Sequence, residues 1–168
     1  MYREIILTPG ELYYLGRLLQ AKYIDYSYIA AMEDISKDYS LFEKETQASL
    51  VSSGALIEDF SGNIEIDSSI TDVLNPVFFG EFESSIHDCI LGEEQAFTVM
   101  KFHLYDAAIT MVTHKNGKFI LKKIDLLEIK EIIENLLSKE YSCEDNLIVD
   151  IVNENILGYH YVVWRILF

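Results

Sequence analysis

The residues best suited to chemistry are a histidine and a cysteine two positions apart, His87 and Cys89. In a strand both side chains would point the same way, as two ligands of one metal ion must. A tetrahedral zinc site normally combines two such close pairs, and the chain offers one. The other candidate ligands stand far apart, at His103, His114, Cys143 and His160. We therefore expect a half-buried strand here and no metal site.

Covalent catalysis would need a serine or cysteine nucleophile beside a histidine base and an orienting carboxylate. All of these residue types occur, but the sequence has no GxSxG, P-loop or GxGxxG motif. Neighbouring carboxylates such as Glu93 and Glu94 are typical of a solvated turn. The sequence therefore predicts a protein that is not an enzyme and that carries no cofactor.

Charge narrows the choice of partner. The 168 residues include 13 basic and 28 acidic side chains, which gives a net charge of −15, and both halves of the chain are acidic. Such a surface repels nucleic-acid phosphates and anionic lipid, so we expect a neutral or basic protein partner and no nucleic acid.

The apolar runs of the sequence are well below the roughly 18 residues of a membrane span, which predicts no membrane insertion. Two cysteines are too few for a disulfide framework, and we expect free thiols in the cytoplasm.

Two capping boxes mark helix starts in the first half of the chain. Thr8 and Glu11 have the required spacing at the end of a strand-like opening, and the leucines that follow recur at helical spacing. Ser40 and Glu43 repeat the capping-box spacing before "LFEKETQASLVSS". Between these two helices, the stretch "YSYIAAMEDI" indicates another, although its tyrosines also suit a strand.

A hairpin completes the first half. Gly54 is expected to end the preceding helix in a left-handed conformation, after which "LIEDFSGNIEI" reads as two short strands joined by a turn. Asp67 then caps a short helix that we expect to end at Asn75 and Pro76. Three helices and a hairpin predict a winged-helix-like half over residues 1–75, with Pro76 as the boundary to the rest. An unrelated helical bundle with a hairpin is the alternative.

A winged helix that reads DNA needs basic or amide side chains on its third helix and its hairpin. The expected third helix offers Lys44 between two glutamates and the amide of Gln47, and the hairpin region carries only acidic charges. We therefore expect this unit to serve packing or protein contact. A third possibility is a degenerate winged-helix regulator that binds through a dimer or ligand surface. This hypothesis would require an affinity for nucleic acid that the charge does not predict.

The second half, residues 76–168, predicts a mostly antiparallel sheet with one long helix on a face. Alternating apolar runs suggest strands, and Asn116 and Gly117 form a strong hairpin turn signal. Asp125 and Glu128 give another capping box, followed by an amphipathic helix, and the tail reads as two strands broken near Gly158. The chain as a whole is therefore expected to be α+β, with both halves packed as one unit.

Apolar residues exceed what one core face needs. Phenylalanines crowd the boundary between the halves, and if one face of "AFTVMKFHLY" packs against the long helix, the other face is only partly polar. An exposed apolar patch of this kind marks a protein-binding site. On this argument the candidate partner-binding residues are Phe78, Phe79, Phe97 and Val99. The alternative is that the tail and the first half of the chain cover them.

The order of these segments resembles a known family. An opening strand before "LTPGELYYLGRLL", then "SSGALIEDFSGNIEI", an Asn-Gly hairpin, "KFILKKIDLLEIKEIIENLL" and a terminal strand are similar to the EspG-like and EsaE-like substrate chaperones of type VII secretion systems. That resemblance implies a cytosolic, non-catalytic protein that binds an amphipathic helical region of a secretion substrate. It carries over no binding residue, so the aromatic positions rest on the patch argument alone.

A second hypothesis follows from charge. An acidic immunity or inhibitor protein that neutralises a basic toxin would use the net charge of −15 to accelerate association. The two hypotheses differ in salt dependence, because an apolar contact tolerates salt and electrostatic steering does not. The sequence leaves the partner's identity, the oligomeric state and the exposed sheet face open.

Overall fold

A computed structural model describes the backbone of residues 4–22, 24–25, 28, 39–80, 82–91, 96–138, 146–154 and 158–166. Side chains are described as far as residue 135, except at position 82 and at positions 87–98. The helices are α1 (Pro9–Leu18), α3 (Tyr39–Ser52), α4 (Ser68–Phe79) and α5 (Leu126–Ser138). The helix expected over "YSYIAAMEDI" lies outside the described residues apart from Tyr28.

A mixed sheet forms the centre of the molecule, and the α+β class is confirmed. Its strands are β1 (Glu4–Leu7), β4 (Phe82–Leu91), β5 (Ala96–Tyr105), β6 (Ala108–Lys115), β7 (Lys118–Ile124), β8 (Asn146–Glu154) and β9 (Gly158–Ile166). Within the described ranges the strand order is β1-β7-β6-β5-β4-β9-β8. Neighbours are antiparallel except β4 and β9, which are parallel. The predicted meander and the two strands around Gly158 are therefore confirmed.

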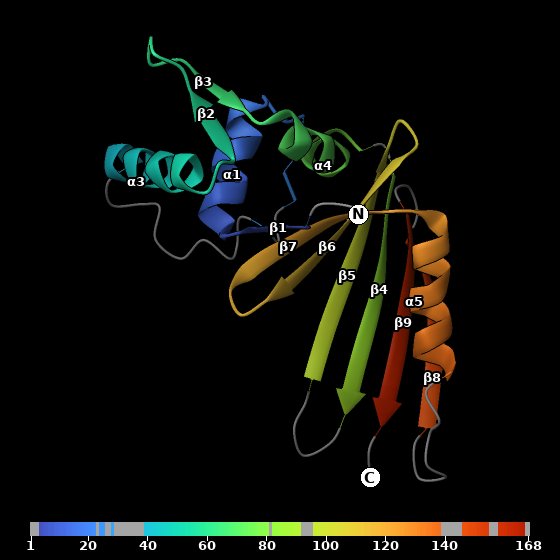
Figure 1. Ribbon diagram of the computed structural model, residues 1–168. Coiled ribbons are helices and arrows are strands. Elements are labelled where there is room, and N and C mark those ends of the chain that lie inside the picture. The colour runs from blue at the N-terminus through green and yellow to red at the C-terminus, as the bar shows by residue number, and fades with distance from the viewer. Residues whose placement is uncertain are drawn as a thin grey trace.

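The two faces of the sheet carry different cores. On one face, side chains of β1, β6 and β7 pack against α1, α3, α4 and the hairpin of β2 (Leu56–Glu58) and β3 (Ile64–Ile66). On the other face, Phe102, Ile109 and Ile124 pack against the inner side of α5. Figure 1 shows the α1, α3 and α4 group near the β1-β7-β6 end of the sheet, and α5 on the other side.

The capping box that opens α1 is confirmed. The backbone NH of Glu11 donates to the Thr8 hydroxyl at 3.2 Å, and the Thr8 NH donates to the Glu11 carboxylate at 2.7 Å. Leu12 and Leu15 are fully buried as their spacing predicts, but Leu18 is exposed. The periodicity therefore identified the helix and its first two turns of core contacts.

Helix α3 ends as predicted but begins earlier. Gly54 has φ +75°, and the NH of Ala55 donates to the Leu50 carbonyl at 2.9 Å, which is the bond pattern of a Schellman motif. The predicted cap at Ser40 is wrong, because α3 already includes Tyr39. A serine and a glutamate three positions apart also suit the interior of a helix, so the spacing alone did not locate its start.

Pro76 lies inside α4, so the predicted helix end at Asn75 and Pro76 is wrong. Proline has no backbone NH, so the helix loses one hydrogen bond, to the carbonyl of Asp72. Asp72 is exposed, so water can reach this position, and the Pro76 ring is buried in the core. The helix continues to Phe79, and the Gly80 NH donates to the Pro76 carbonyl at 3.0 Å. The expected boundary between residues 1–75 and 76–168 therefore falls within one helix. In addition, β1 from the first half pairs with β7 from the second.

Candidate functional site

An apolar groove lies between the start of α5 and the sheet. Its volume is about 790 Å³, within the range of roughly 300–1,000 Å³ that is usual for binding pockets. Strands β4, β5, β6 and β7 form its floor, and the first two turns of α5 form one wall. We call it the α5 groove and define it by Phe102, Leu104, Ile109, Leu126, Ile129 and Ile133.

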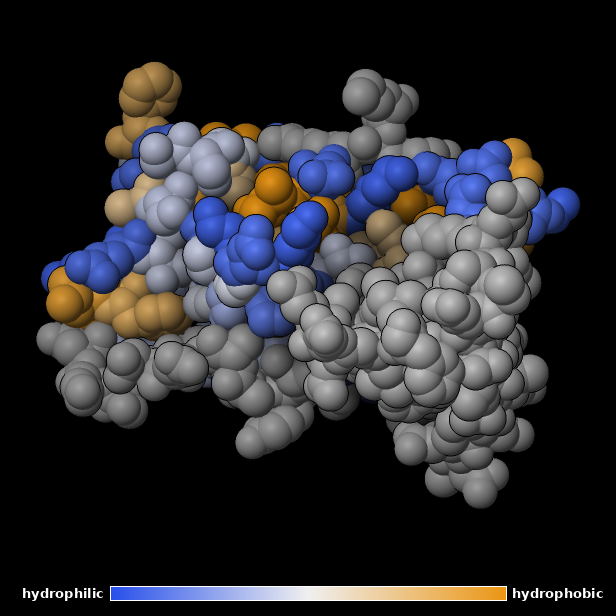
Figure 2. Space-filling model, turned by 90° about the horizontal axis from the view of Figure 1, so that it is seen from below, coloured by the Kyte–Doolittle hydropathy of each residue, from blue (hydrophilic) through white to orange (hydrophobic). Residues whose placement is uncertain are grey.

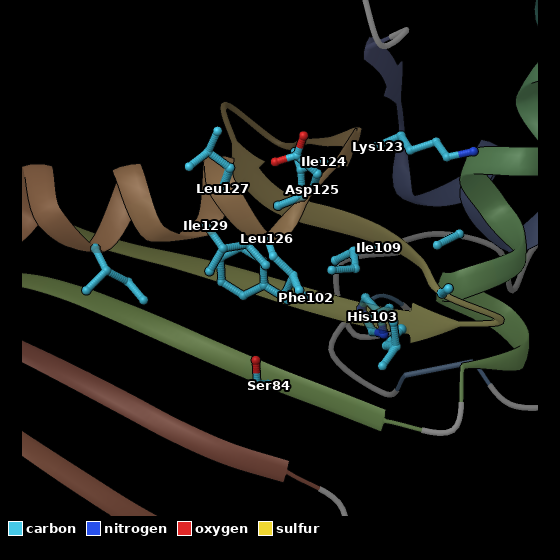
Figure 3. A pocket seen from close by; sticks show the side chains of 14 residues that line it. Ser84, Phe102, His103, Ile109, Lys123, Ile124, Asp125, Leu126, Leu127 and Ile129 are labelled. Atoms are coloured by element: carbon cyan, nitrogen blue, oxygen red, sulfur yellow. The ribbon is translucent and has the colours of Figure 1, made fainter.

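The orientation of these side chains follows from strand alternation. Phe102 and Leu104 point to the α5 side of β5, whereas His103 between them points to the other face. Figure 3 shows Phe102, Ile109 and Ile129 gathered between the helix and the sheet, while Lys123 points away from them. The groove therefore offers mainly apolar contacts, with Ser84 and Asp125 as polar groups at its border.

Two leucines at the start of α5 are unusually exposed. Leu126 is 75% exposed and Leu127 is 63% exposed, and both belong to the groove. The capping box fixes their position: the Glu128 NH donates to Asp125 Oδ1 at 2.9 Å, and the Asp125 NH donates to Glu128 Oε2 at 3.1 Å. Apolar side chains held in water on an ordered helix start are typical of a protein contact surface.

The turn between β5 and β6 borders the groove from the opposite side. Asp106 and Ala107 both have positive φ, 45° and 62°, as a two-residue type I′ hairpin requires. Alanine is disfavoured in this conformation, where glycine would be unstrained. Ala107 nevertheless lines the groove, so its methyl group adds apolar surface at the cost of local strain.

The predicted partner-binding residues do not gather at this groove. Phe78 is 1% exposed and belongs to the core, so it is unavailable to a partner and that assignment is wrong. Phe79 is half-buried, with its ring centroid 6.3 Å from that of Tyr105. Val99 is half-buried on the β5 face opposite the groove, because it alternates with Met100, which packs in the α5 core. The side chain of Phe97 lies outside the described residues.

A polar cluster occupies the face of β5 opposite the groove. The Tyr28 hydroxyl and His103 Nε2 are hydrogen-bonded at 2.9 Å, and Glu83 Oε2 lies 3.7 Å from His103 Nδ1. Lys101 forms ion pairs with Asp25 and, at 3.4 Å, with Glu83. A carboxylate, an imidazole and a hydroxyl next to one another could relay a proton, but Tyr28 and His103 are only 3% and 4% exposed, so a substrate has little access to them. The cluster therefore fastens Asp25 and Tyr28 to the sheet.

Burial controls the charge of this cluster. Burial is the main reason that the pKa of His103 is lowered to about 4; the nearby Lys101 ammonium acts in the same direction, and the carboxylate of Asp25 opposes both effects. For Lys101, burial alone would lower the pKa, but the contacts with Asp25 and Glu83 outweigh it and raise the pKa above its ordinary value. At neutral pH the cluster thus holds a neutral imidazole beside a charged, paired lysine.

The described residues contain no group of three or more His, Cys, Asp and Glu side chains that could hold a metal ion. The side chains of His87 and Cys89, the candidate zinc pair, lie outside the described residues. Within the described part of the chain, no helix has the length and hydropathy needed to cross a membrane. No protein-family model matches the sequence, and no curated protein matches it at a significant level.

Sequence reasoning missed the groove because the distance between α5 and the sheet is set by packing, and the sequence hints at it only in the first turn of the helix. Leu126 and Leu127 follow the cap residue Asp125 directly, and two adjacent helix positions point about 100° apart. The amphipathic pattern of this helix includes Leu126, but the described inner face of α5 consists of Ile129, Ile132 and Ile133. An adjacent leucine pair in a first turn was the available hint.

Proposed function

We propose that this protein is a non-catalytic chaperone or adaptor that holds an apolar helical segment of another protein in the α5 groove. The observation that supports this most directly is the exposed Leu126 and Leu127 pair beside a preformed apolar groove. Burying a leucine side chain fully contributes about 1.5–3 kcal/mol, so a few such contacts suffice for binding after association costs. An amphipathic helix fits a groove of this kind through residues spaced three and four apart.

The client we propose is a helical substrate of a type VII secretion system, held in the cytoplasm before export. This part of the proposal rests on the resemblance in segment order to EspG-like chaperones. The net charge of −15 adds that the client's flanking residues are neutral or basic.

The proposal is tested with labelled helical peptides. One peptide carries leucines on one face and lysines on the other, and a second replaces every lysine by glutamate. We expect Leu126→Glu to weaken binding of the lysine peptide at least 10-fold in fluorescence anisotropy. Leu41→Glu is the matched control, because Leu41 is also an exposed helical leucine, 51% exposed and on α3, and it should bind like the wild type. Equal binding by Leu126→Glu and the wild type would exclude the groove.

The client class needs its own test. Helical secretion substrates encoded near this chain's gene should co-purify with it at low salt and at roughly 0.5 M salt, because apolar contacts tolerate salt. Retention of none of them would remove type VII secretion from the proposal while leaving groove binding intact.

A second candidate is an acidic inhibitor of a basic toxin, which the charge of −15 favours. Its association rate would fall steeply between 0.05 and 0.5 M salt, since steering operates through screened long-range charge. Stopped-flow measurements over that range separate the two functions.

A further inference from the structure

Phe60 stands fully in solvent at the tip of the β2–β3 hairpin. Its relative exposure is 114%, the highest of the large apolar residues in the described part of the chain, and Ile57 on the same hairpin is 55% exposed. Figure 1 shows the hairpin projecting from the rest of the molecule, away from α5. The hairpin therefore presents an aromatic ring at a distance from the α5 groove.

The turn that carries Phe60 is held by its own hydrogen bonds. Asp59 Oδ1 accepts from the backbone NH of Ser61 at 2.7 Å and of Asn63 at 2.9 Å, and Asp59 Oδ2 accepts from the Asn63 side-chain amide at 2.8 Å. The Gly62 NH donates to the Asp59 carbonyl at 3.0 Å, and Gly62 has φ +81°. A turn closed by a left-handed glycine is a standard three-residue hairpin loop. The ring is thus presented by an ordered backbone.

The base of the hairpin is fixed to the core. Leu56 is 2% exposed, and both Ile64 and Ile66 pack against the core cluster. The Asp67 NH donates to the Ala55 carbonyl at 3.1 Å, which extends the pairing below the two strands. Because base and turn are both ordered, little conformational entropy remains to be lost when the tip is bound.

The surroundings of the ring indicate what it contacts. The hairpin segment 56–66 carries Glu58, Asp59 and Glu65 and contains no lysine or arginine. The hydrogen bonds from Asn63 hold the pKa of Asp59 below its ordinary value, so the carboxylate stays charged well into the acidic range. Three acidic groups beside an aromatic disfavour insertion into anionic lipid and contact with nucleic acid.

We propose that Phe60 is a protein-binding anchor, which inserts into an apolar pocket edged by lysine or arginine side chains on a partner protein. Aromatic residues on ordered supports are frequent hot spots at protein interfaces. The acidic residues around Phe60 pair with the basic edge and set the orientation. This site is independent of the α5 groove and gives the molecule a second contact point.

The test replaces Phe60 by the photoreactive residue p-benzoylphenylalanine in the full chain, produced in its native host. Irradiation should link position 60 to one protein, and mass spectrometry should map the linked peptide to an apolar site flanked by lysine or arginine. The same residue placed at Leu41, another exposed apolar position, should not give that product. Crosslinks to lipid, to a second copy of this chain or to no molecule would overturn the proposal.

Capture alone is insufficient, so the linked partner is then purified and its affinity measured. We expect Phe60→Ala to weaken binding roughly 10- to 100-fold, the equivalent of burying one aromatic side chain. Glu58→Lys with Glu65→Lys should weaken it in low salt, and Leu41→Glu should leave it unchanged. Binding of Phe60→Ala at the wild-type affinity would refute the anchor role. Thermal melts establish that each variant is folded.

Discussion

His103 links the pH dependence of stability to one buried ring. Its pKa is about 4 in the folded protein and 6.5 in an unfolded chain, because burial disfavours the imidazolium. The unfolded state therefore binds more protons between these values. The stabilisation from this residue is complete above about pH 6.5 and is lost as the pH falls toward 4, to a total of about 3 kcal/mol.

We expect His103→Gln to flatten the fall in unfolding free energy between pH 6.5 and 4, whatever its effect at neutral pH. Urea titrations at intervals across this range measure the slope. If the variant loses stability in parallel with the wild type, carboxylates elsewhere account for the acid response and the neutral state of His103 does not.

Truncation of two phenylalanines should change the unfolding free energy by very different amounts. Phe78 packs against Gly16 in the core, where a Cβ on the glycine would lie 2.9 Å from the Phe78 ring. Phe78→Ala should lower the unfolding free energy by about 3–5 kcal/mol through loss of burial and the cavity left behind. Phe60→Ala should change it by less than about 0.5 kcal/mol, because its ring is in water. Chemical denaturation measures both, and similar losses would contradict the assigned environments.

At the scale of the secondary-structure elements, the β5–β6 turn stores strain that a single substitution should release. Ala107→Gly places glycine where φ is 62°, and we expect a gain of about 0.5–1 kcal/mol in unfolding free energy. Ala108→Gly is the matched control: Ala108 begins β6, and glycine there should cost roughly 0.5–1 kcal/mol. A loss of stability in Ala107→Gly would show that the methyl group contributes more by packing than it costs in strain.

Turn and cap chemistry made much of the fold predictable from sequence. Thr8 with Glu11, Asp125 with Glu128, and Asn116 with Gly117 act through bonds within a few residues, and the structure confirms all three. Pro76 failed as a signal because the core around it outweighs one lost hydrogen bond. The groove depends on how far α5 stands from β5 and β6, which no local pattern encodes.

At the scale of the whole molecule, the two halves should not fold separately. A fragment of residues 76–168 lacks β1, which pairs with β7 in the sheet, and it lacks α1 and most of α4, which share a core with Val112, Phe119 and Leu121. We expect this fragment to be insoluble alone and to become soluble when it is co-produced with residues 1–75. Independent solubility of the fragment, with native-like circular dichroism, would restore the boundary at Pro76.

Charged and apolar groups alternate over the part of the surface that Figure 2 shows. On the described part of the face in Figure 2, apolar groups are small and stand between hydrophilic ones. The net charge of −15 keeps molecules apart, so exposed groups such as Leu126 and Phe60 need not cause self-association. The composition predicted this balance, but the positions of the apolar groups required the fold.

The pairing of β1 with β7 also bears on how the protein is made. Residues 4–7 complete the sheet edge only against residues 119–122, so Ile5 and Leu7 have no partner strand until β7 has left the ribosome. At usual synthesis rates that interval is on the order of 10 s. The nascent chain thus presents the apolar side chains of β1 without their partner strand during that interval, so a protein that we propose to shield others is itself exposed to association while it is being synthesised.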